Sequence, residues 1–164
     1  MPNWAYGKVE VIAKFDNLVK FFTEELYHPD LKQADWLDIS DNQIKAKFDP
    51  VLGKDNPVLW FKNLKRSHVQ DCDMEVNGFP SKTIDRNKDD DPISVHFTWA
   101  EAAWSWDDKK LAELSERTNS EIIVKAEEPN MGFRQFIHVK NGEVLEYRED
   151  DLPDDDESEE IYDD

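Results

Sequence analysis

The prediction of the fold starts from residues 93–128, which read ISVHFTWAEAAWSWDDKKLAELSERTNSEIIVKAEE. Apolar residues alternate through the first part, at Ile93, Val95, Phe97 and Trp99, which predicts a strand over 93–104. Asp107 is then a suitable N-cap for a helix over 107–118, and β-branched residues predict a second strand over 120–128. The stretch therefore predicts a β–α–β unit.

Both ends of the chain extend this pattern. Residues 4–13 predict a strand, and residues 15–26 have helical spacing, with Asp16 as an N-cap and Pro29 as the stop. After residue 128, a further strand is followed by Asn141-Gly142, a dipeptide typical of tight β-hairpins, and then by the returning strand EVLEYRE.

The middle of the chain, residues 28–92, gives weaker signals. Residues 43–48 alternate like a strand, and residues 68–76 are a candidate for another. The segment 57–67 fits a short helix or a buried segment equally well, and residues 84–91 are polar enough for a loop.

Two β–α–β-like halves predict an α+β fold in which one sheet carries two helices on one face. We therefore expect a ferredoxin-like split β-α-β sandwich that forms a single domain over residues 1–148. In this prediction residues 28–92 are an inserted or irregular segment. Residues 149–164, the acidic tail, are expected to be disordered because they contain too few apolar residues to offset the entropy of ordering.

The net charge of the chain is −18, and its acidic tail contains eleven Asp and Glu residues and no Lys or Arg. Residues 1–148 therefore carry only −7. Negative charge is repelled by phosphate, which argues against direct binding to nucleic acid or to an anionic membrane. The expected partners are basic surfaces, including the clefts of nucleic-acid-binding proteins.

Other sequence features favour a cytoplasmic protein. Cys72 is the only cysteine, so no internal disulfide can form. The first residues lack the basic and apolar regions of a signal peptide, and no apolar run reaches the ~20 residues that span a bilayer.

The sequence offers little support for an enzyme. No histidine lies at ligand spacing from another His or Cys, apart from the pair His68 and Cys72. Glu127 and Glu128 are adjacent on a predicted strand, so they should point to opposite faces and not share a site. We predict no catalytic residue, no metal and no cofactor.

Several motifs carry a resemblance to a known family. The opening MPNW with Tyr6, the passage FTWAEAAWSW before a helix, and LAELSERTNSEIIVKAEEPNMGF occur in the order seen in the YubB-like ferredoxin-fold proteins of phages, plasmids and other mobile elements. The chain resembles that family over about residues 1–27 and 93–148, and departs from it at Ala5, where Cys is expected. The resemblance implies a ferredoxin-like fold, a mobile-element origin and a bacterial host cell, and it supplies no catalytic residues.

The acidic tail suggests a function by its charge density. Sixteen extended residues span at most roughly 53–58 Å. Eleven charges over that length give one per ~5 Å, within a factor of two of one nucleic-acid strand. We therefore predict a non-enzymatic inhibitor or modulator that occupies the basic groove of a nucleic-acid-binding host defence protein, with Ile161 and Tyr162 as an apolar anchor. The candidate partner-binding residues are Glu149, Asp150, Asp151, Asp154, Asp155, Asp156, Glu157, Glu159, Glu160, Trp104 and Trp106.

Three alternatives remain open. Trp104 and Trp106 fit core and sheet-end packing as well as exposed anchors. The tail could serve only solubility, while the folded body acts as an adaptor for a phage or plasmid protein. An enzyme that uses its carboxylates with a metal has the least support.

Overall fold

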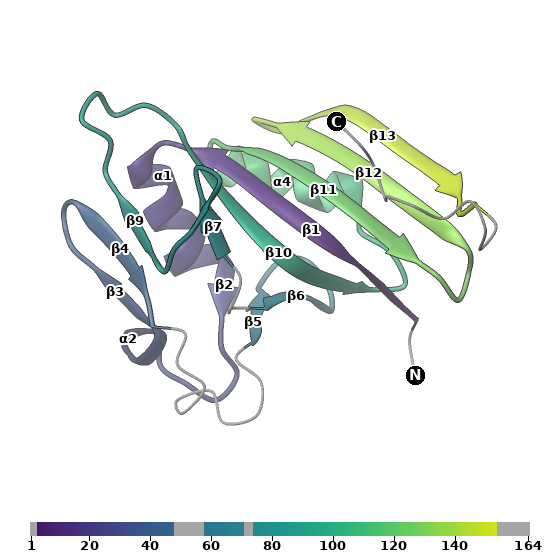
Figure 1. Cartoon of the computed structure of the whole chain (residues 1–164), viewed down its shortest axis with the longest axis horizontal. Helices are drawn as coiled ribbons and strands as arrows, with labels where there is room; N and C mark the ends of the chain where they lie inside the picture. Colours follow the sequence, from purple (N-terminus) through teal and green to yellow (C-terminus); the bar gives the residue numbers. More distant parts are fainter. Residues whose placement is uncertain (1–2, 48–57, 71–73, 154–164) are drawn as a thin grey trace.

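The computed structural model describes residues 3–47, 58–70 and 74–153, and antiparallel strands dominate it (Figure 1). Within these residues the main sheet has ten strands. Eight follow one another in the order β13 (Glu143–Asp151), β12 (Phe133–Lys140), β11 (Glu121–Glu128), β1 (Trp4–Ala13), β10 (Ile93–Ala103), β6 (Ser67–Gln70), β5 (Val58–Phe61) and β2 (Leu26–Tyr27). The other two are β7 (Met74–Val76), which pairs with β10, and β8 (Phe79–Pro80), which pairs with β7.

A smaller sheet and short helices complete the described part of the chain. The smaller sheet contains β3 (Leu37–Ile39), β4 (Gln43–Ala46) and β9 (Thr83–Asp85). The helices are α1 (Phe15–Lys20), the π-helical turn η1 (Phe21–Glu25), α2 (Gln33–Trp36) and α4 (Asp108–Arg117). None of the helices in the described ranges is long and apolar enough to cross a membrane.

The predicted ferredoxin-like α+β sandwich is wrong. Residues 28–92 are not an insertion beside a small sheet, because β5 to β8 extend the main sheet and β3, β4 and β9 form the second one. The segment 57–67, for which a helix was one alternative, contains β5, and the candidate strand at 68–76 contains the end of β6 and all of β7. Strands of two to four residues are too short for a periodic pattern, so their pairing depends on the rest of the sheet.

The local prediction from residues 93–128 is confirmed. β10 and β11 both pair antiparallel with β1, so they run parallel to each other with β1 between them, and α4 connects them. Asp107 caps α4, because its Oδ1 accepts the backbone N–H groups of Lys109 and Lys110 at 3.0 and 3.1 Å.

Two other predicted caps and turns have different outcomes. Asn141 and Gly142 have φ values of 48° and 92°, which confirms the tight hairpin between β12 and β13. Asp16 is not the N-cap of the first helix, because Lys14 occupies that position. Asp16 lies in the first turn, where its carboxylate is 2.8 Å from the guanidinium of Arg86.

The main sheet has one buried face and one open face. Alternate residues of the central strands, such as Val9, Val11 and Ile93, form a common core with α1, η1 and α4. Phe21 and Phe22 of η1 both contact the ring of Phe97 on β10. The other face of β1, β10 and β11 is only partly covered, as is usual for one side of an antiparallel sheet.

A bulge changes which residues of β10 face the core. Gly7 of β1 pairs with Ala100 and Val9 pairs with Phe97, so two residues of β10 lie opposite Lys8 alone. Trp99 is consequently turned to the open face and is 38% exposed, whereas the sequence pattern placed it with the buried Phe97. At this point the backbones come so close that a Cβ on Gly7 would lie 1.9 Å from the carbonyl oxygen of Lys125.

Candidate functional site

The open face carries a continuous row of polar and aromatic side chains across the main sheet. Residues that pair directly on neighbouring antiparallel strands project to the same face. The strand register joins the following residues, which we call the open-face row: Tyr27, Trp60, His68, Glu101, Tyr6, Glu127, Arg134 and Asp150.

Aromatic rings cover the centre of this row. The ring of His68 lies 4.7 Å from that of Trp60 and 5.5 Å from that of Trp4. Tyr6 stacks on Trp99, with ring centroids 5.1 Å apart and planes at 15°. Flat rings at the surface next to carboxylates are suited to contact cationic side chains of another molecule.

His68 and Glu101 form the most buried polar pair of the row. His68 Nε2 lies 3.1 Å from Glu101 Oε2, and Trp99 Nε1 donates to the other carboxylate oxygen at 3.2 Å. Burial lowers the pKa of His68, and the neighbouring Glu101 opposes this shift only in part. The lowered pKa favours the neutral ring, and Nδ1 is buried without a hydrogen-bond partner among the described residues.

Tyr6 and Glu127 form the second pair. The Tyr6 hydroxyl donates to Glu127 Oε1 at 3.1 Å, and burial, followed by the interaction with Glu127, raises the pKa of Tyr6. Glu128 points to the opposite face, where it is buried and accepts the backbone N–H of Asn130 at 3.1 Å. The prediction that the two glutamates do not share a site is confirmed.

The structure places the first three residues of the predicted tail in strand β13. Glu149, Asp150 and Asp151 pair with Gln135, Arg134 and Phe133, so the tail does not begin at residue 149 as a disordered segment. The sequence does not reveal this strand end, because backbone pairing with β12 orders it without burying any side chain. All nine residues of β13 are exposed. The six further acidic candidates, Asp154, Asp155, Asp156, Glu157, Glu159 and Glu160, lie outside the described residues.

The acidic edge consists of the carboxylates of β13, which are Glu143, Glu146, Glu149, Asp150 and Asp151. Arg148 is the single basic residue of the strand; its guanidinium forms an ion pair with Glu146 and lies over the ring of Phe136 at 4.7 Å. The strand is the last in the order of the main sheet, and it leads directly into the rest of the acidic sequence (Figure 1).

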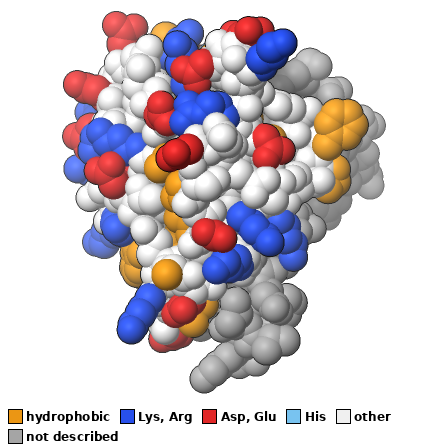
Figure 2. Space-filling model, turned by 90° about the vertical axis from the view of Figure 1, so that its left-hand side faces the viewer, with side chains coloured by type: hydrophobic (Ala, Val, Ile, Leu, Met, Phe, Trp, Pro, Cys, Tyr) orange, Lys and Arg blue, Asp and Glu red, His pale blue; other side chains and the backbone are white. Residues whose placement is uncertain are grey.

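Charge is arranged differently on the side of the molecule where β3, β4 and β9 lie. Figure 2 shows Lys and Arg side chains interspersed with Asp and Glu side chains there, without a large patch of one sign. One such group is Arg86 with Asp16 and Asp90, whose carboxylates lie 2.8 and 3.5 Å from the guanidinium. The interaction with Arg86 lowers the pKa of Asp16.

The two candidate tryptophans have different environments. Trp104 is 53% exposed, as expected for an anchor. Trp106 is only 3% exposed, and its indole Nε1 donates to the carbonyl of Ala5 at 3.2 Å. The assignment of Trp106 to partner binding is therefore wrong, because this side chain is part of the core.

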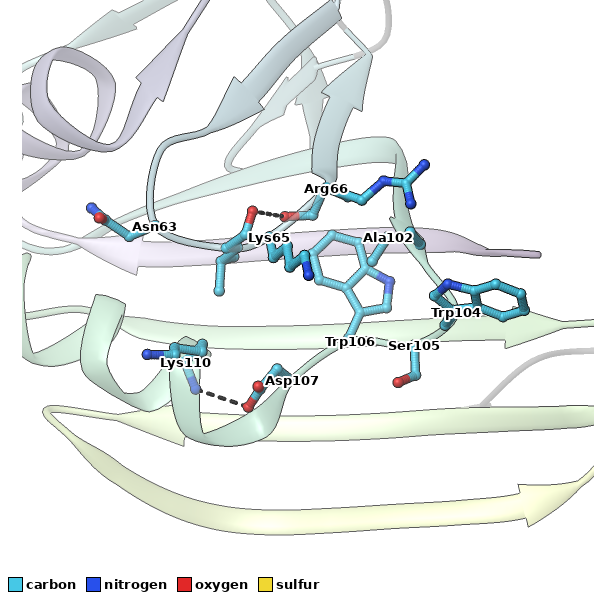
Figure 3. A pocket seen from close by; sticks show the side chains of 12 residues that line it. Asn63, Lys65, Arg66, Ala102, Trp104, Ser105, Trp106, Asp107 and Lys110 are labelled. Carbon is cyan, nitrogen blue, oxygen red and sulfur yellow. Dashed lines mark hydrogen bonds between the residues drawn. The ribbon is translucent and has the colours of Figure 1, made fainter. Parts of the chain in front are cut away.

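Trp104 and Trp106 line a cavity of about 400 Å³ between the β5–β6 loop and the start of α4 (Figure 3). Lys65, Arg66 and Lys110 also line it. The sequence alone did not predict this site, although KNLKR at 62–66 is a dense group of basic residues in an acidic chain. The missing information was that this loop lies beside residues 102–110.

Comparisons with family models, with curated proteins and with solved structures found no match for this chain. The resemblance to YubB-like proteins therefore stays a prediction from sequence motifs. Among the described residues, no group of three or more His, Cys, Asp or Glu side chains is placed to hold a metal ion. Cys72 lies outside them, so the pair with His68 is not described.

Proposed function

We propose that this chain is a non-enzymatic interaction protein that binds the basic surface of a nucleic-acid-binding protein and competes there with the nucleic acid. The observation that carries this proposal is the acidic edge, a fully exposed edge strand with five carboxylates that continues into the acidic sequence. If the chain comes from a mobile element, as its motifs suggest, the partner is a host defence protein in the bacterial cytoplasm.

The geometry of β13 supports charge mimicry. A strand rises about 3.4 Å per residue, so five carboxylates over nine residues give one carboxylate per ~6 Å of strand, with Glu143, Glu146 and Asp150 on the open face and the other two on the opposite face. This spacing is within a factor of two of the ~3.4 Å between phosphates of one strand. Carboxylates held at this density can replace phosphates in a groove lined by Lys and Arg, and counterion release then makes the affinity depend on salt.

The side of β13 that faces away from β12 pairs with no other described strand, and it adds a second means of binding. An edge strand presents unpaired backbone N–H and C=O groups, with which an extended segment of a partner can pair. The negative side chains disfavour pairing with another copy of the same acidic strand and favour a basic segment. Val144, Leu145 and Tyr147 are exposed between the acids and supply apolar contact.

The test neutralises the edge without changing its shape. Glu143, Glu146 and Glu149 are replaced by Gln, and Asp150 and Asp151 by Asn. The matched control neutralises five exposed acids elsewhere on the chain, namely Glu24, Asp30, Asp38, Asp89 and Asp91, which form no ion pair among the described residues. Both full-length variants are compared with the original chain for capture of proteins from bacterial lysate, which are identified by mass spectrometry.

The captured protein is then purified, and its affinity is measured against rising salt and against competing duplex DNA. We expect the edge variant to lose the partner, the control variant to keep it, and DNA to displace the chain. Equal binding by the edge variant and the control, or failure of DNA to compete, would overturn the proposal.

The open-face row favours a second candidate, an adaptor that binds a protein partner through its folded body. Trp99 and Tyr6 are stacked and accessible on this face, next to Glu101 and Glu127. Binding of this kind should survive high salt and neutralisation of the edge, and it should be lost in Trp99→Ala.

A further inference from the structure

The cavity at the start of α4 stands out because it gathers positive charge on a strongly acidic chain. Its lining comes from two segments far apart in sequence, residues 63–67 of the β5–β6 loop and β6, and residues 102–107 and 110 at the end of β10 and the start of α4 (Figure 3). Three cationic side chains and one carboxylate, that of Asp107, line it.

The cations of the cavity are available for a ligand. Lys65 and Arg66 are exposed and form no ion pair with the residues that the structure describes. Lys110 lies 3.4 Å from Glu113, but both side chains are more than half exposed, and such a surface pair contributes little. Asp107 already accepts the first N–H groups of α4, so the cationic side chains, and not the end of the helix, are the groups that can hold an anion.

The backbone around the cavity is held in an unfavourable conformation at two positions. Arg66 and Trp104 have φ values of 52° and 71°, in the left-handed region that bulky residues rarely adopt. Hydrogen bonds fix both: the N–H of Ala103 donates to the carbonyl of Arg66 at 3.0 Å, and the N–H of Trp104 donates to the carbonyl of Asn3 at 2.6 Å. Strained residues of this kind cluster at ligand sites.

We propose that this cavity binds a nucleoside phosphate. Lys65, Arg66 and Lys110 provide donors and charge for the phosphate, and guanidinium and ammonium groups are its usual partners in proteins. The exposed ring of Trp104 provides a flat surface against which the base can stack. The volume of about 400 Å³ lies within the range of small-molecule sites.

The surrounding charge selects a small ligand and not a polymer. Asp107 and Asp108 lie beside the cavity, and the net charge of −18 repels a long polyanion. A mononucleotide places its few charges next to the cations only. This proposal is independent of the acidic edge, which lies on another strand and binds positive charge.

The test is isothermal titration of the full chain at low salt with AMP, adenosine, inorganic phosphate and a 5′-phosphorylated oligonucleotide. We expect saturable binding of AMP below roughly 1 mM. Adenosine and phosphate should each bind about tenfold more weakly, because each lacks one half of the recognition. Tighter binding of the oligonucleotide than of AMP, or no saturable binding of AMP, would overturn the proposal.

Variants separate the two halves of the site. Lys65→Gln and Arg66→Gln should each weaken the binding of AMP about tenfold, since each removes a charged hydrogen bond. Trp104→Ala should lower the affinity for AMP to that for phosphate alone. The matched control is Lys88→Gln, an exposed lysine outside the cavity, which should bind AMP like the original chain. Because Lys65 and Arg66 are exposed, their variants keep the fold, and unchanged AMP binding in both would contradict the assignment.

Discussion

The acidic edge and the basic cavity differ in more than the sign of their charge. The acidic edge lies on a strand whose nine residues are all exposed and which, among the strands that the structure describes, pairs with β12 alone. The cavity rests on buried residues, because Leu64 and Trp106 of its lining belong to the core. Charge on an edge strand can therefore change at little cost to the fold, whereas the cations of the cavity are placed by buried contacts.

One buried ion pair connects the loop that carries those cations to the helices of the core. Glu25 is 3% exposed and accepts two hydrogen bonds of 2.9 Å from Arg117. It also accepts from the Asn63 amide at 3.1 Å, and its carbonyl accepts the N–H of Lys62 at 2.9 Å. The loop is thereby connected both to η1 and to the last turn of α4.

The largest expected effect comes from Glu25→Ala. Removing one partner of a buried pair costs about 3 kcal/mol of unfolding free energy, at the lower end of the usual range because Arg117 is partly exposed. Urea unfolding followed by circular dichroism measures the loss, and Glu25→Gln, which keeps some hydrogen bonds, should lose less. AMP affinity should also fall. An unchanged unfolding free energy would mean that this pair does not fasten the loop.

The next effect is a gain in stability from Arg66→Gly. A left-handed conformation costs a residue with a Cβ roughly 1–2 kcal/mol. Glycine removes this strain, but its freer unfolded chain offsets part of the gain, so the net increase is about 1 kcal/mol or less. Arg66→Ala keeps the Cβ and should not gain. Both variants should bind AMP less well, and a Gly variant no more stable than the Ala variant would rule out strain at this position.

A smaller effect is expected on the acidic edge from Tyr147→Phe. The Tyr147 hydroxyl accepts from Gln135 at 3.2 Å and lies 3.4 Å from Glu149, and the side chain is 43% exposed. Losing this group should cost about 0.5–1 kcal/mol. Thermal unfolding checks the size, and a loss as large as that of Glu25→Ala would contradict the difference between the two regions.

The smallest expected effect is that of pH on β6, the strand that contains His68 and whose first residue, Ser67, lines the cavity. Because burial lowers the pKa of His68, the unfolded chain binds this proton more readily than the folded one. The contribution of neutral His68 to the free energy of unfolding is therefore fully present above the ordinary pKa of 6.5. It decreases as the pH falls through that value toward the lowered folded-state pKa. The change is small because Glu101 partly opposes it.

Hydrogen exchange at pH 7 and pH 5 measures where this change acts. After correction for the slower intrinsic exchange at the lower pH, we expect weaker protection of the β6 amides at pH 5 than at pH 7, and no such change in β13. The acid effect should disappear in His68→Gln and persist in His28→Gln. If it persisted in His68→Gln, another group would be responsible.

Most long elements could be predicted from sequence, and most short ones could not. Strand 4–13, the helix after Asp107 and the Asn141-Gly142 hairpin each have a strong local signal in periodicity, capping or turn chemistry. β3, β5 and β7 have three or four residues each, which is too few to show a period. The ferredoxin-like assignment was wrong because these strands enlarge one sheet and build another.

Of the two candidate sites, only the acidic one was proposed from the sequence, and six of its nine acidic residues lie outside the described residues. Composition alone identifies a concentration of carboxylates near the C-terminus and the kind of partner it favours, since charge does not depend on the fold. The environments of the tryptophans depend on tertiary structure. A bulge turns Trp99 to the open face, and packing between distant segments buries Trp106 and leaves Trp104 exposed. The cavity likewise exists only because residues 63–67 meet residues 102–110, a contact between segments far apart along the chain.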